Sequence, residues 1–499
     1  MTTENRFLYV LVFVVGSASL GAEIAAARLM APFFGASTIV WANTIWVVLV
    51  ALSIGYWLGG RVADRHPHQR GLCLLVLTAA VLIAIVPFIA RPFLDVSVDA
   101  LDEISAGAFV GSLVAVLVLI AVPVILLGAC SPYAVRLAVP DVEHSGRVAG
   151  RLYAISTAGS LLGTWLAALL LIPLVGTQRT FLAFALVIAL VAATGLGWRF
   201  VAVPAALAAV VALPAGVVKG SDDTILFEGD TEYQYVRVIE RPNGDRLLEL
   251  NEGLAMHSFY RPGSYLTGHY WDAMLTYPFA ALDSPPERIA ILGDAAGTTA
   301  RAYGHYFPAT GVDGVEIDGE LTDLGHRFFG LDNPNLTTYD EDARPWLERS
   351  EGGYDVIIVD AYRQPYIPFY LATREFFELV RDRLAPGGVV IVNVGHPEGS
   401  DDLETVLGRT MSEAFPTVIR DPIEATNTLL LGSEAPASAQ HLRTAAAQQI
   451  PDPELSNIAY IEAARIGPRL PGGSVYTDDR APVEWLIDRS ILGYAADND

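Results

Sequence analysis

Glycine and carboxylate residues recur along the second half of the chain, each beside an apolar run that predicts a β-strand. The turn Gly293-Asp294-Ala295-Ala296-Gly297 comes first, and Glu316, Asp342 and Asp360 follow it. Glycines let a backbone approach a ligand, and N–H groups at the start of a helix can face it. An acid about 20 residues further on can accept hydrogen bonds from both hydroxyls of a ribose. This order predicts a site for an adenosyl nucleotide.

Within that site each residue has an expected part. Gly293, Asp294 and Gly297 form the turn against the ligand, Glu316 takes the ribose, and Asp342 is placed to take the amino group of adenine. Asp360 ends its own strand beside them. One such acid alone could equally be a helix cap or a solvated loop charge. Together, in order and at strand ends, the residues point to binding.

The elements that must position these residues alternate between strand and helix, which predicts a parallel, doubly wound, Rossmann-like α/β sheet. Ligands bind such sheets at the carboxyl ends of the strands. The expected strands are 288–292, 314–317, 355–359 and 389–394, and the expected helices are 298–306, 321–329 and 374–384. Upstream, Asn243-Gly244 predicts a hairpin between 235–241 and 246–250, and a helix is expected over 264–281. We therefore expect a small β subdomain at 219–283 and the nucleotide-binding domain at 284–499.

Charge is unevenly distributed over the 499 residues, of which 52% are hydrophobic and 17% charged. Residues 1–218 hold 9 acidic and 11 basic side chains, and the rest hold 46 acidic and 21 basic ones. The shift predicts a domain boundary near Lys219, the chain's one lysine. An acidic, lysine-poor surface is typical of a halophile, although a GC-rich genome also depletes lysine. The same acidity argues against nucleic-acid binding.

Residues 1–218 predict a polytopic bundle of about seven transmembrane helices, which makes the lipid bilayer a partner and the cell membrane the location. The expected spans are 7–29, 39–60, 71–90, 107–129, 152–174, 180–197 and 200–218. The connections 60–70 and 130–151 carry arginines, which places both connections and the N-terminus in the cytoplasm. Seven full spans would export the following domain. Because adenosyl nucleotides are cytoplasmic, we expect one of the two short last spans not to cross and the soluble domain to be cytoplasmic.

Polar residues inside the first span are Glu23 and Arg28, which are costly there unless paired or facing a cavity. They indicate either a transport or substrate site or a structural contact between helices. Cys73 and Cys130 lie in apolar segments and give neither a disulfide framework nor a metal motif, so no metal is expected.

Both halves resemble the fused membrane/spermidine-synthase-like proteins. Gly60-Arg61-Val62-Ala63-Asp64-Arg65 also resembles a loop signature of major-facilitator transporters. Further matching stretches are 21–24, 131–137, 146–157, 233–234, 354–360 and 477–484. The resemblance implies a methyltransferase/spermidine-synthase fold that binds S-adenosylmethionine or its decarboxylated form and transfers a group to a small molecule such as an amine. Spermidine synthases commonly pair, so the resemblance also suggests a homodimer.

Several site residues match the family's roles. The resemblance makes Gln234 the nucleoside-binding glutamine, Glu316 the ribose acid and Asp342 the adenine acid. It makes Asp360 the catalytic carboxylate that takes the proton of the attacking amine. His257 and Tyr270 lie where the family lines its substrate.

Three positions depart from the family pattern. The acid that holds the donor's amine is Ala296 here, the acid that grips the polyamine is Arg363, and a strand-end aspartate is Asn251. Arg363 would repel a diamine and suits a carboxylate instead, such as that of intact S-adenosylmethionine. We therefore expect a membrane-anchored transferase whose acceptor is open. The alternatives are a transporter or sensor whose adenosyl domain does not turn over, and an S-adenosylmethionine-dependent methyltransferase.

Overall fold

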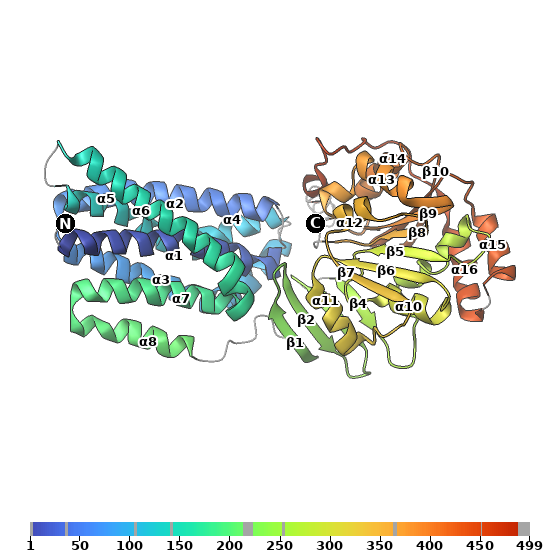
Figure 1. Cartoon of the computed structure of the whole chain (residues 1–499), viewed down its shortest axis with the longest axis horizontal. Coiled ribbons are helices and arrows are strands. Elements are labelled where there is room, and N and C mark those ends of the chain that lie inside the picture. The colour runs from blue at the N-terminus through green and yellow to red at the C-terminus, as the bar shows by residue number, and fades with distance from the viewer. Residues whose placement is uncertain are drawn as a thin grey trace. The chain divides into compact units, whose positions relative to one another are not determined.

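The computed structural model describes residues 3–34, 38–103, 107–139, 143–212, 223–251, 255–362, 367–450 and 452–487. The chain forms two compact units (Figure 1). Unit 1 comprises Met1–Gly220 with Glu228–Tyr235, and unit 2 comprises Ser221–Phe227 with Val236–Asp499. The boundaries predicted from charge and from strand order stay predictions.

Unit 1 is a bundle of long apolar helices that lie side by side (Figure 1). The α-helices are α1 (Thr3–Phe34), α2 (Thr38–Arg65), α3 (Gln69–Glu103), α4 (Gly107–Leu119), α5 (Ala121–Ala138), α6 (Ser145–Leu166), α7 (Ile172–Leu196) and α8 (Ala202–Val211). A π-helical turn, Ala167–Leu171, joins α6 to α7, and a 3-10 turn, Trp198–Val201, precedes α8.

Small residues bring α1 and α6 into backbone contact. A Cβ atom at Gly159 would collide with the carbonyl oxygen of Phe13, and one at Gly163 with that of Ser17. Close approach of this kind strengthens van der Waals packing between apolar helices. These two glycines therefore serve the bundle.

By length and composition, five apolar helical stretches among the described residues could cross a membrane. They are Arg6–Met30, Val40–Arg65, Gln69–Ala90, Ala121–Ala138 and Ser145–Leu196, and Val110–Leu119 and Trp198–Val211 are shorter apolar helices. The longest stretch is not one straight rod, because Gly176 has a φ of 82° and breaks it. The expected count of about seven spans is not confirmed and stays a prediction.

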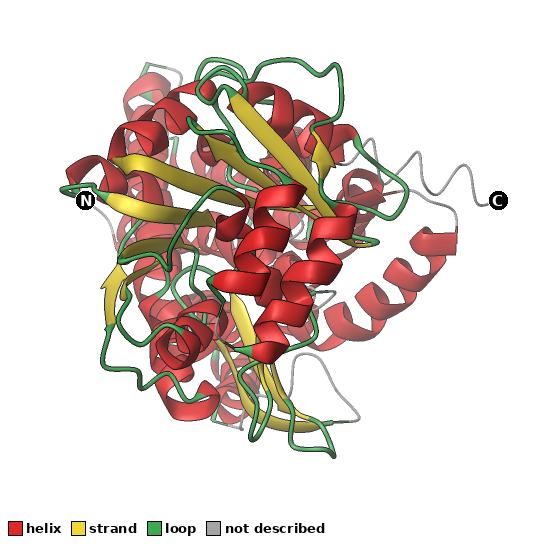
Figure 2. Ribbon diagram, turned by 90° about the vertical axis from the view of Figure 1, so that its right-hand side faces the viewer, coloured by secondary structure: helices red, strands yellow, loops and turns green. Residues whose placement is uncertain are grey.

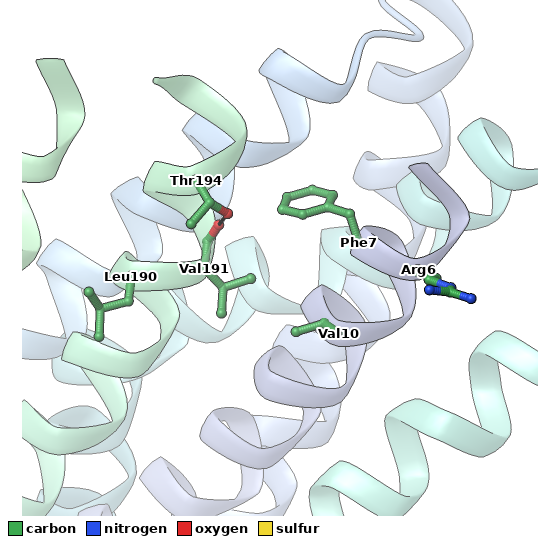
Figure 3. A pocket seen from close by; sticks show the side chains of 6 residues that line it. All are labelled: Arg6, Phe7, Val10, Leu190, Val191 and Thr194. Carbon is green, nitrogen blue, oxygen red and sulfur yellow. Dashed lines mark hydrogen bonds between the residues drawn. The ribbon is translucent and has the colours of Figure 1, made fainter. Parts of the chain in front are cut away.

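A shallow apolar pocket lies between α1 and α7 (Figure 3). Its lining includes Phe7 and Val10 of α1 with Leu190, Val191 and Thr194 of α7, and Arg6 at its edge. In Figure 3 the guanidinium of Arg6 points away from Leu190, so the pocket presents hydrocarbon surface.

The first four strands of the chain form a sheet in the order β1 (Thr224–Asp230), β2 (Tyr235–Glu240), β3 (Arg246–Leu250) and β4 (Met256–Tyr260). The predicted hairpin is present, with Gly244 at a φ of 85°. The helix expected over 264–281 is wrong. Only α9 (Tyr270–Ala273) and a 3-10 turn, Tyr277–Ala280, form there, because Gly268 has a φ of 81° and Pro278 lacks a donor N–H.

The main sheet has eight strands in the order β12-β10-β11-β9-β8-β5-β6-β7. The run β9-β8-β5-β6-β7 is parallel, and β11, β10 and β12 add antiparallel pairs. The strands are β5 (Arg288–Leu292), β6 (Gly311–Glu316), β7 (Leu336–Asp340), β8 (Tyr354–Val359), β9 (Leu384–Gly395), β10 (Thr417–Glu424), β11 (Asn427–Ser433) and β12 (Gly467–Pro468). This order confirms the predicted Rossmann-like α/β fold of the C-terminal part.

Helices cover both faces of this twisted sheet, as Figure 2 shows. One face packs against α12 (Ala343–Arg349), α13 (Arg374–Arg383) and α14 (Asp402–Met411), and the other against α10 (Thr298–Tyr306), α15 (Ala439–Gln448) and α16 (Pro453–Arg465). The small sheet packs on α11 (Gly319–Leu324) and the π turn Gly325–Phe329. Apolar strands buried on both faces are expected of such a sheet.

Candidate active site

The predicted glycine turn and acids gather at the carboxyl ends of neighbouring parallel strands. Gly293 follows β5 and Asp360 follows β8, and β5 and β8 pair directly. The N–H of Asp360 donates to the carbonyl of Leu292 at 2.9 Å. A Cβ atom at Gly293 would lie 2.7 Å from the carbonyl oxygen of Asp360, and its φ is 89°. Glycine is therefore required where the two strand ends meet.

The N–H groups of the glycine turn, residues 293–297, are all bonded within the protein. Gly293 and Asp294 donate to the carbonyl of Val315, and Gly297 donates to that of Asp294. The two alanines between them donate to side chains, Ala295 to Glu316 Oε2 at 3.0 Å and Ala296 to Ser258 Oγ at 2.9 Å. The N–H groups of residues 293–297 are thus taken up within the protein, and the expectation that N–H groups at the start of α10 face a ligand stays a prediction.

The side chain of Asp294, in the same turn, contacts the start of α10. Its carboxylate accepts the N–H of Ala300 in the first turn of α10, where a negative charge is favoured. Burial raises the pKa of Asp294 well above its usual range, and the charges of Glu316 and Asp360 raise it further. The start of α10 is thus already capped by the carboxyl group of Asp294. Such a turn suits a nucleoside without phosphates, and a direct ligand contact by Asp294 stays a prediction.

Glu316 ends β6 and is held by two backbone donors. Its Oε2 accepts the N–H of Ala295, and its Oε1 accepts that of Asp318 at 3.1 Å. Burial raises the pKa of Glu316 to about 7, against the lowering effect of these hydrogen bonds. Each oxygen keeps a further lone pair, so the fixed carboxylate can still accept from two hydroxyl groups.

Asp360 is half-buried and carries hydrogen bonds on both oxygens. Asn393 Nδ2 donates to Oδ1 at 2.8 Å, and the hydroxyl of Tyr270 lies 3.2 Å from Oδ2. Burial raises the pKa of Asp360 to about 7, although hydrogen bonds from Asn393, Tyr270 and Trp271 lower it. A carboxylate that exchanges a proton near neutral pH is suited to general-base catalysis.

Asp342 lies after β7 and caps α12. Its Oδ1 accepts the N–H of Arg344 at 3.1 Å, and its Oδ2 accepts the hydroxyl of Tyr370 at 2.7 Å. The structure thus gives Asp342 a structural part, and its expected contact with adenine stays a prediction.

The other expected substrate residues have separate placements. His257 lies on β4, and burial lowers its pKa to about 4, so its ring is neutral. Its Nε2 is buried without a hydrogen-bond partner in the described part of the chain. Gln234 is buried beside β2, where its N–H donates to Thr231 Oγ1. Arg363 lies outside the described residues, so its expected role is untested.

In unit 1, Arg28 donates to the backbone carbonyls of Thr231 and Tyr233, within the segment that belongs to this unit. Glu23 lies five residues earlier on α1 and is half-buried. A transport or substrate role for the two residues stays a prediction. Within the described ranges no group of three or more histidine, cysteine or acidic residues could hold a metal ion.

Sequence reasoning missed Asn393, Asn427 and Glu424, which surround Asp360 and Tyr270. Asn393 Oδ1 accepts from Asn427 Nδ2 at 3.0 Å. Glu424 Oε1 accepts the N–H of Tyr270 at 3.0 Å and contacts His269 Nδ1 at 3.3 Å. One signal was available: Asn393 interrupts an otherwise apolar run in β9. A buried amide inside such a run is costly unless it is hydrogen-bonded.

Residues 270–433 match the spermine/spermidine synthase domain family. A probable polyamine aminopropyl transferase of Bifidobacterium longum is 33% identical over 297 residues, which are 55% of this chain and 65% of that protein. Putrescine N-methyltransferase 1 of Nicotiana tabacum is 30% identical over 175 residues, or 34% and 44%. The chain thus spans less than two thirds of the length of these relatives.

A solved structure, of a probable spermidine synthase from Corynebacterium glutamicum, is 23% identical with a TM-score of 0.39. The similarity covers 51% of this chain and 98% of that one. The match to the family begins at Tyr270 and includes Glu316, Asp360 and Asn393. The C-terminal part of this chain contains a spermidine synthase domain, and polyamine aminopropyltransferases are among its relatives.

Proposed function

We propose that the C-terminal domain transfers an aminopropyl group from decarboxylated S-adenosylmethionine to an amine, with Asp360 as the general base. The observation that supports this most is the Asp360 carboxylate itself, held by Asn393 and Tyr270 beside the glycine turn, with a pKa near 7. Relatives named as polyamine aminopropyltransferases make the same reaction class the first candidate.

The donor site supports a nucleoside that carries no phosphate. The N–H groups from Gly293 to Gly297 are bonded internally, and Asp294 meets the start of α10. A pyrophosphate would find the N–H groups of residues 293–297 already bonded and would face the carboxyl group of Asp294. A sulfonium nucleoside has a positive charge instead, which would favour the ionised form of the neighbouring carboxyl groups of Asp294, Glu316 and Asp360.

In the proposed reaction the amine nitrogen of the acceptor attacks the aminopropyl carbon that is bonded to sulfur. A C–N bond forms as the C–S bond breaks, and the bonding pair leaves with sulfur as neutral methylthioadenosine. The nitrogen becomes an ammonium, and one of its protons passes to Asp360. Since the leaving group needs no proton, the protein's part is to orient the two reactants and accept that proton.

The test uses the full chain in detergent and molar salt, with either donor and a set of diamines. Wild-type protein should release methylthioadenosine from the decarboxylated donor. Asp360→Asn should lower kcat at least about 100-fold, the usual contribution of a general base, and leave donor affinity within a few-fold. Asp382→Asn, at an exposed position, is the matched control. Full activity in Asp360→Asn would refute the assignment of the base.

Methyl transfer from S-adenosylmethionine is the second candidate, because putrescine N-methyltransferases are also relatives. Ala296 is buried and offers no carboxylate at the position where the resemblance places the acid for the donor's amine. The same assay separates the two reactions. S-adenosylhomocysteine as product would establish methyl transfer, whereas binding of either donor without any product would favour the sensor or transporter.

We further propose that unit 1 anchors the protein as a multi-pass membrane protein with unit 2 in the cytoplasm. The five long apolar stretches support anchoring by length and composition. A cytoplasmic unit 2 would have access to adenosyl nucleotides. A fluorescent protein fused after Asp499 should fluoresce, since such proteins mature in the cytoplasm, and a dark, protease-accessible fusion on the outer surface would contradict this orientation.

A further inference from the structure

A chain of side-chain amides ends at the carboxylate of Asp360. Asn393 is buried in β9, with apolar neighbours on both sides in the strand. Its Nδ2 donates to Asp360 Oδ1 at 2.8 Å, and its Oδ1 accepts from Asn427 Nδ2 at 3.0 Å. Asn427 opens β11, directly after the turn between β10 and β11. Both ends of the Asn393 amide are therefore bonded.

This arrangement fixes which end of the amide meets the carboxylate. If the Asn393 amide turned over, its oxygen would face Asp360 Oδ1 and its nitrogen would face the donor of Asn427. Two acceptors and two donors would then oppose each other, and each buried group left without a partner costs free energy. Asn427 thus keeps Asn393 oriented as a donor to Asp360.

A residue beside the same turn also binds Tyr270, the second hydrogen-bond partner of Asp360. Glu424, which pairs with Asn427 across the turn, accepts the N–H of Tyr270. The Tyr270 hydroxyl donates to Asp360 Oδ2. The β10–β11 turn therefore reaches both oxygens of Asp360, one through Asn393 and the other through Tyr270.

We propose that Asn427 and Asn393 are positioning residues that fix the orientation and proton affinity of Asp360 for the transfer reaction. The proposal rests on the proposed function, in which Asp360 accepts the proton of the attacking amine. With Oδ1 held by Asn393, the remaining lone pairs of the carboxylate stay directed toward the acceptor. We call the hydrogen-bond chain from Asn427 through Asn393 to Asp360 the relay. Because a hydrogen bond to the charged form of an acid favours that form, the relay keeps Asp360 ionised at lower pH.

The first experiment compares the full-length wild type with Asn393→Ala and Asn427→Ala over a range of pH. Asn427 is half-buried at the first position of β11, so its variant tests the hydrogen-bond chain from Asn427 through Asn393 to Asp360 with little risk to folding. We expect kcat to fall about tenfold or more, the donor KM to change less than about threefold, and the acid limb of kcat/KM to move to higher pH. Asn335→Ala is the matched control, since Asn335 donates to the Thr310 carbonyl away from Asp360.

If the two residues have only a structural role, both variants should be less stable to heat and the pH profile of kcat/KM should not move. That result would overturn the relay.

A second measurement needs no turnover. The difference in melting temperature between the wild type and Asp360→Asn is measured as a function of pH. The same difference is then measured in proteins that also carry Asn393→Ala. A midpoint that moves to higher pH in the Asn393→Ala background supports the relay even if no transfer is detected, and then the proposed function alone fails. An unmoved midpoint overturns the relay.

Discussion

The hydroxyl of Tyr270 lies 3.2 Å from Oδ2 of Asp360, although the residues are 90 positions apart. Tyr270 begins α9, and Asp360 follows β8. Burial raises the pKa of Tyr270 well above its usual range, and the charge of Asp360 raises it further, so the phenol keeps its proton. Tyr270 is therefore the hydrogen-bond donor of the pair, and the ionised carboxylate of Asp360 is the acceptor.

Tyr270→Phe removes this donor and keeps the ring. Since the hydrogen bond lowers the pKa of Asp360, its loss should move the acid limb of the pH–rate profile to higher pH. We expect kcat to fall about tenfold, the effect of one hydrogen bond to a charged group. Tyr460→Phe, at an exposed position, serves as control. An unchanged acid limb would show that the phenol does not act on Asp360.

Asp360 should also make stability depend on pH in a defined direction. Its pKa is about 7 in the folded protein and about 4 in an unfolded chain. Between these values the folded state binds more protons, so stability falls as pH rises from about 4 to 7. Asp360→Asn removes the buried charge. It should therefore raise the melting temperature at pH 8 and have little effect at pH 4.

Thermal unfolding of the full chain across this pH range measures the effect. Glu316 has a raised pKa in the same window, so wild-type stability alone cannot report on Asp360. The difference between wild type and Asp360→Asn cancels the contribution of Glu316. Asp382→Asn should show no pH-dependent difference. A stabilisation of Asp360→Asn at pH 4 and not at pH 8 would contradict the burial of this charge.

Local sequence patterns predicted the strand ends but not the groups that meet there. Gly293, Glu316 and Asp360 were found because each stands at the boundary of an apolar run, which encodes a strand by itself. Asn427 approaches Asp360 only because the sheet order is β8-β9-β11. That order is set by pairing between segments far apart in the chain. The hydrophobic pattern within one segment therefore does not predict the order of the strands.

The hydrogen bonds of the glycine turn likewise depend on segments far apart in the chain. Ala296 donates to Ser258 Oγ, which lies on β4 in the other sheet, 38 residues earlier. Ala295 donates to Glu316, the residue expected to meet the ribose. The sequence of the turn and its helix alone does not contain these tertiary partners.

Glu316→Gln should separate nucleoside binding from proton transfer. Both oxygens of Glu316 accept backbone N–H groups, so an amide NH2 would oppose one of these donors and could accept from only one ribose hydroxyl. We expect the affinity for methylthioadenosine to fall about ten- to 100-fold, a loss of about 1–3 kcal/mol. Calorimetric titration measures it, with the exposed Glu320→Gln as control. Undiminished affinity would place the ribose elsewhere.

Variants of Asp342 test whether a residue that caps a helix can also bind adenine. It accepts the N–H of Arg344 and the hydroxyl of Tyr370, so Asp342→Ala should cost about 1 kcal/mol for the cap and a similar amount for the second bond. Asp342→Asn keeps a capping oxygen and should be closer to wild type in stability.

The adenine contact is measured as a ratio of affinities, which a general loss of stability does not change. Inosine presents a carbonyl oxygen where adenosine presents an amino group, so a carboxylate acceptor should discriminate against it. We expect wild type to prefer methylthioadenosine over methylthioinosine, and Asp342→Ala to lose most of that preference. If the ratio is the same in both proteins, Asp342 only caps α12, and the amino group is bound by another acceptor. If it collapses in Asp342→Ala while folding persists, one carboxylate both ends the loop after β7 and selects the base.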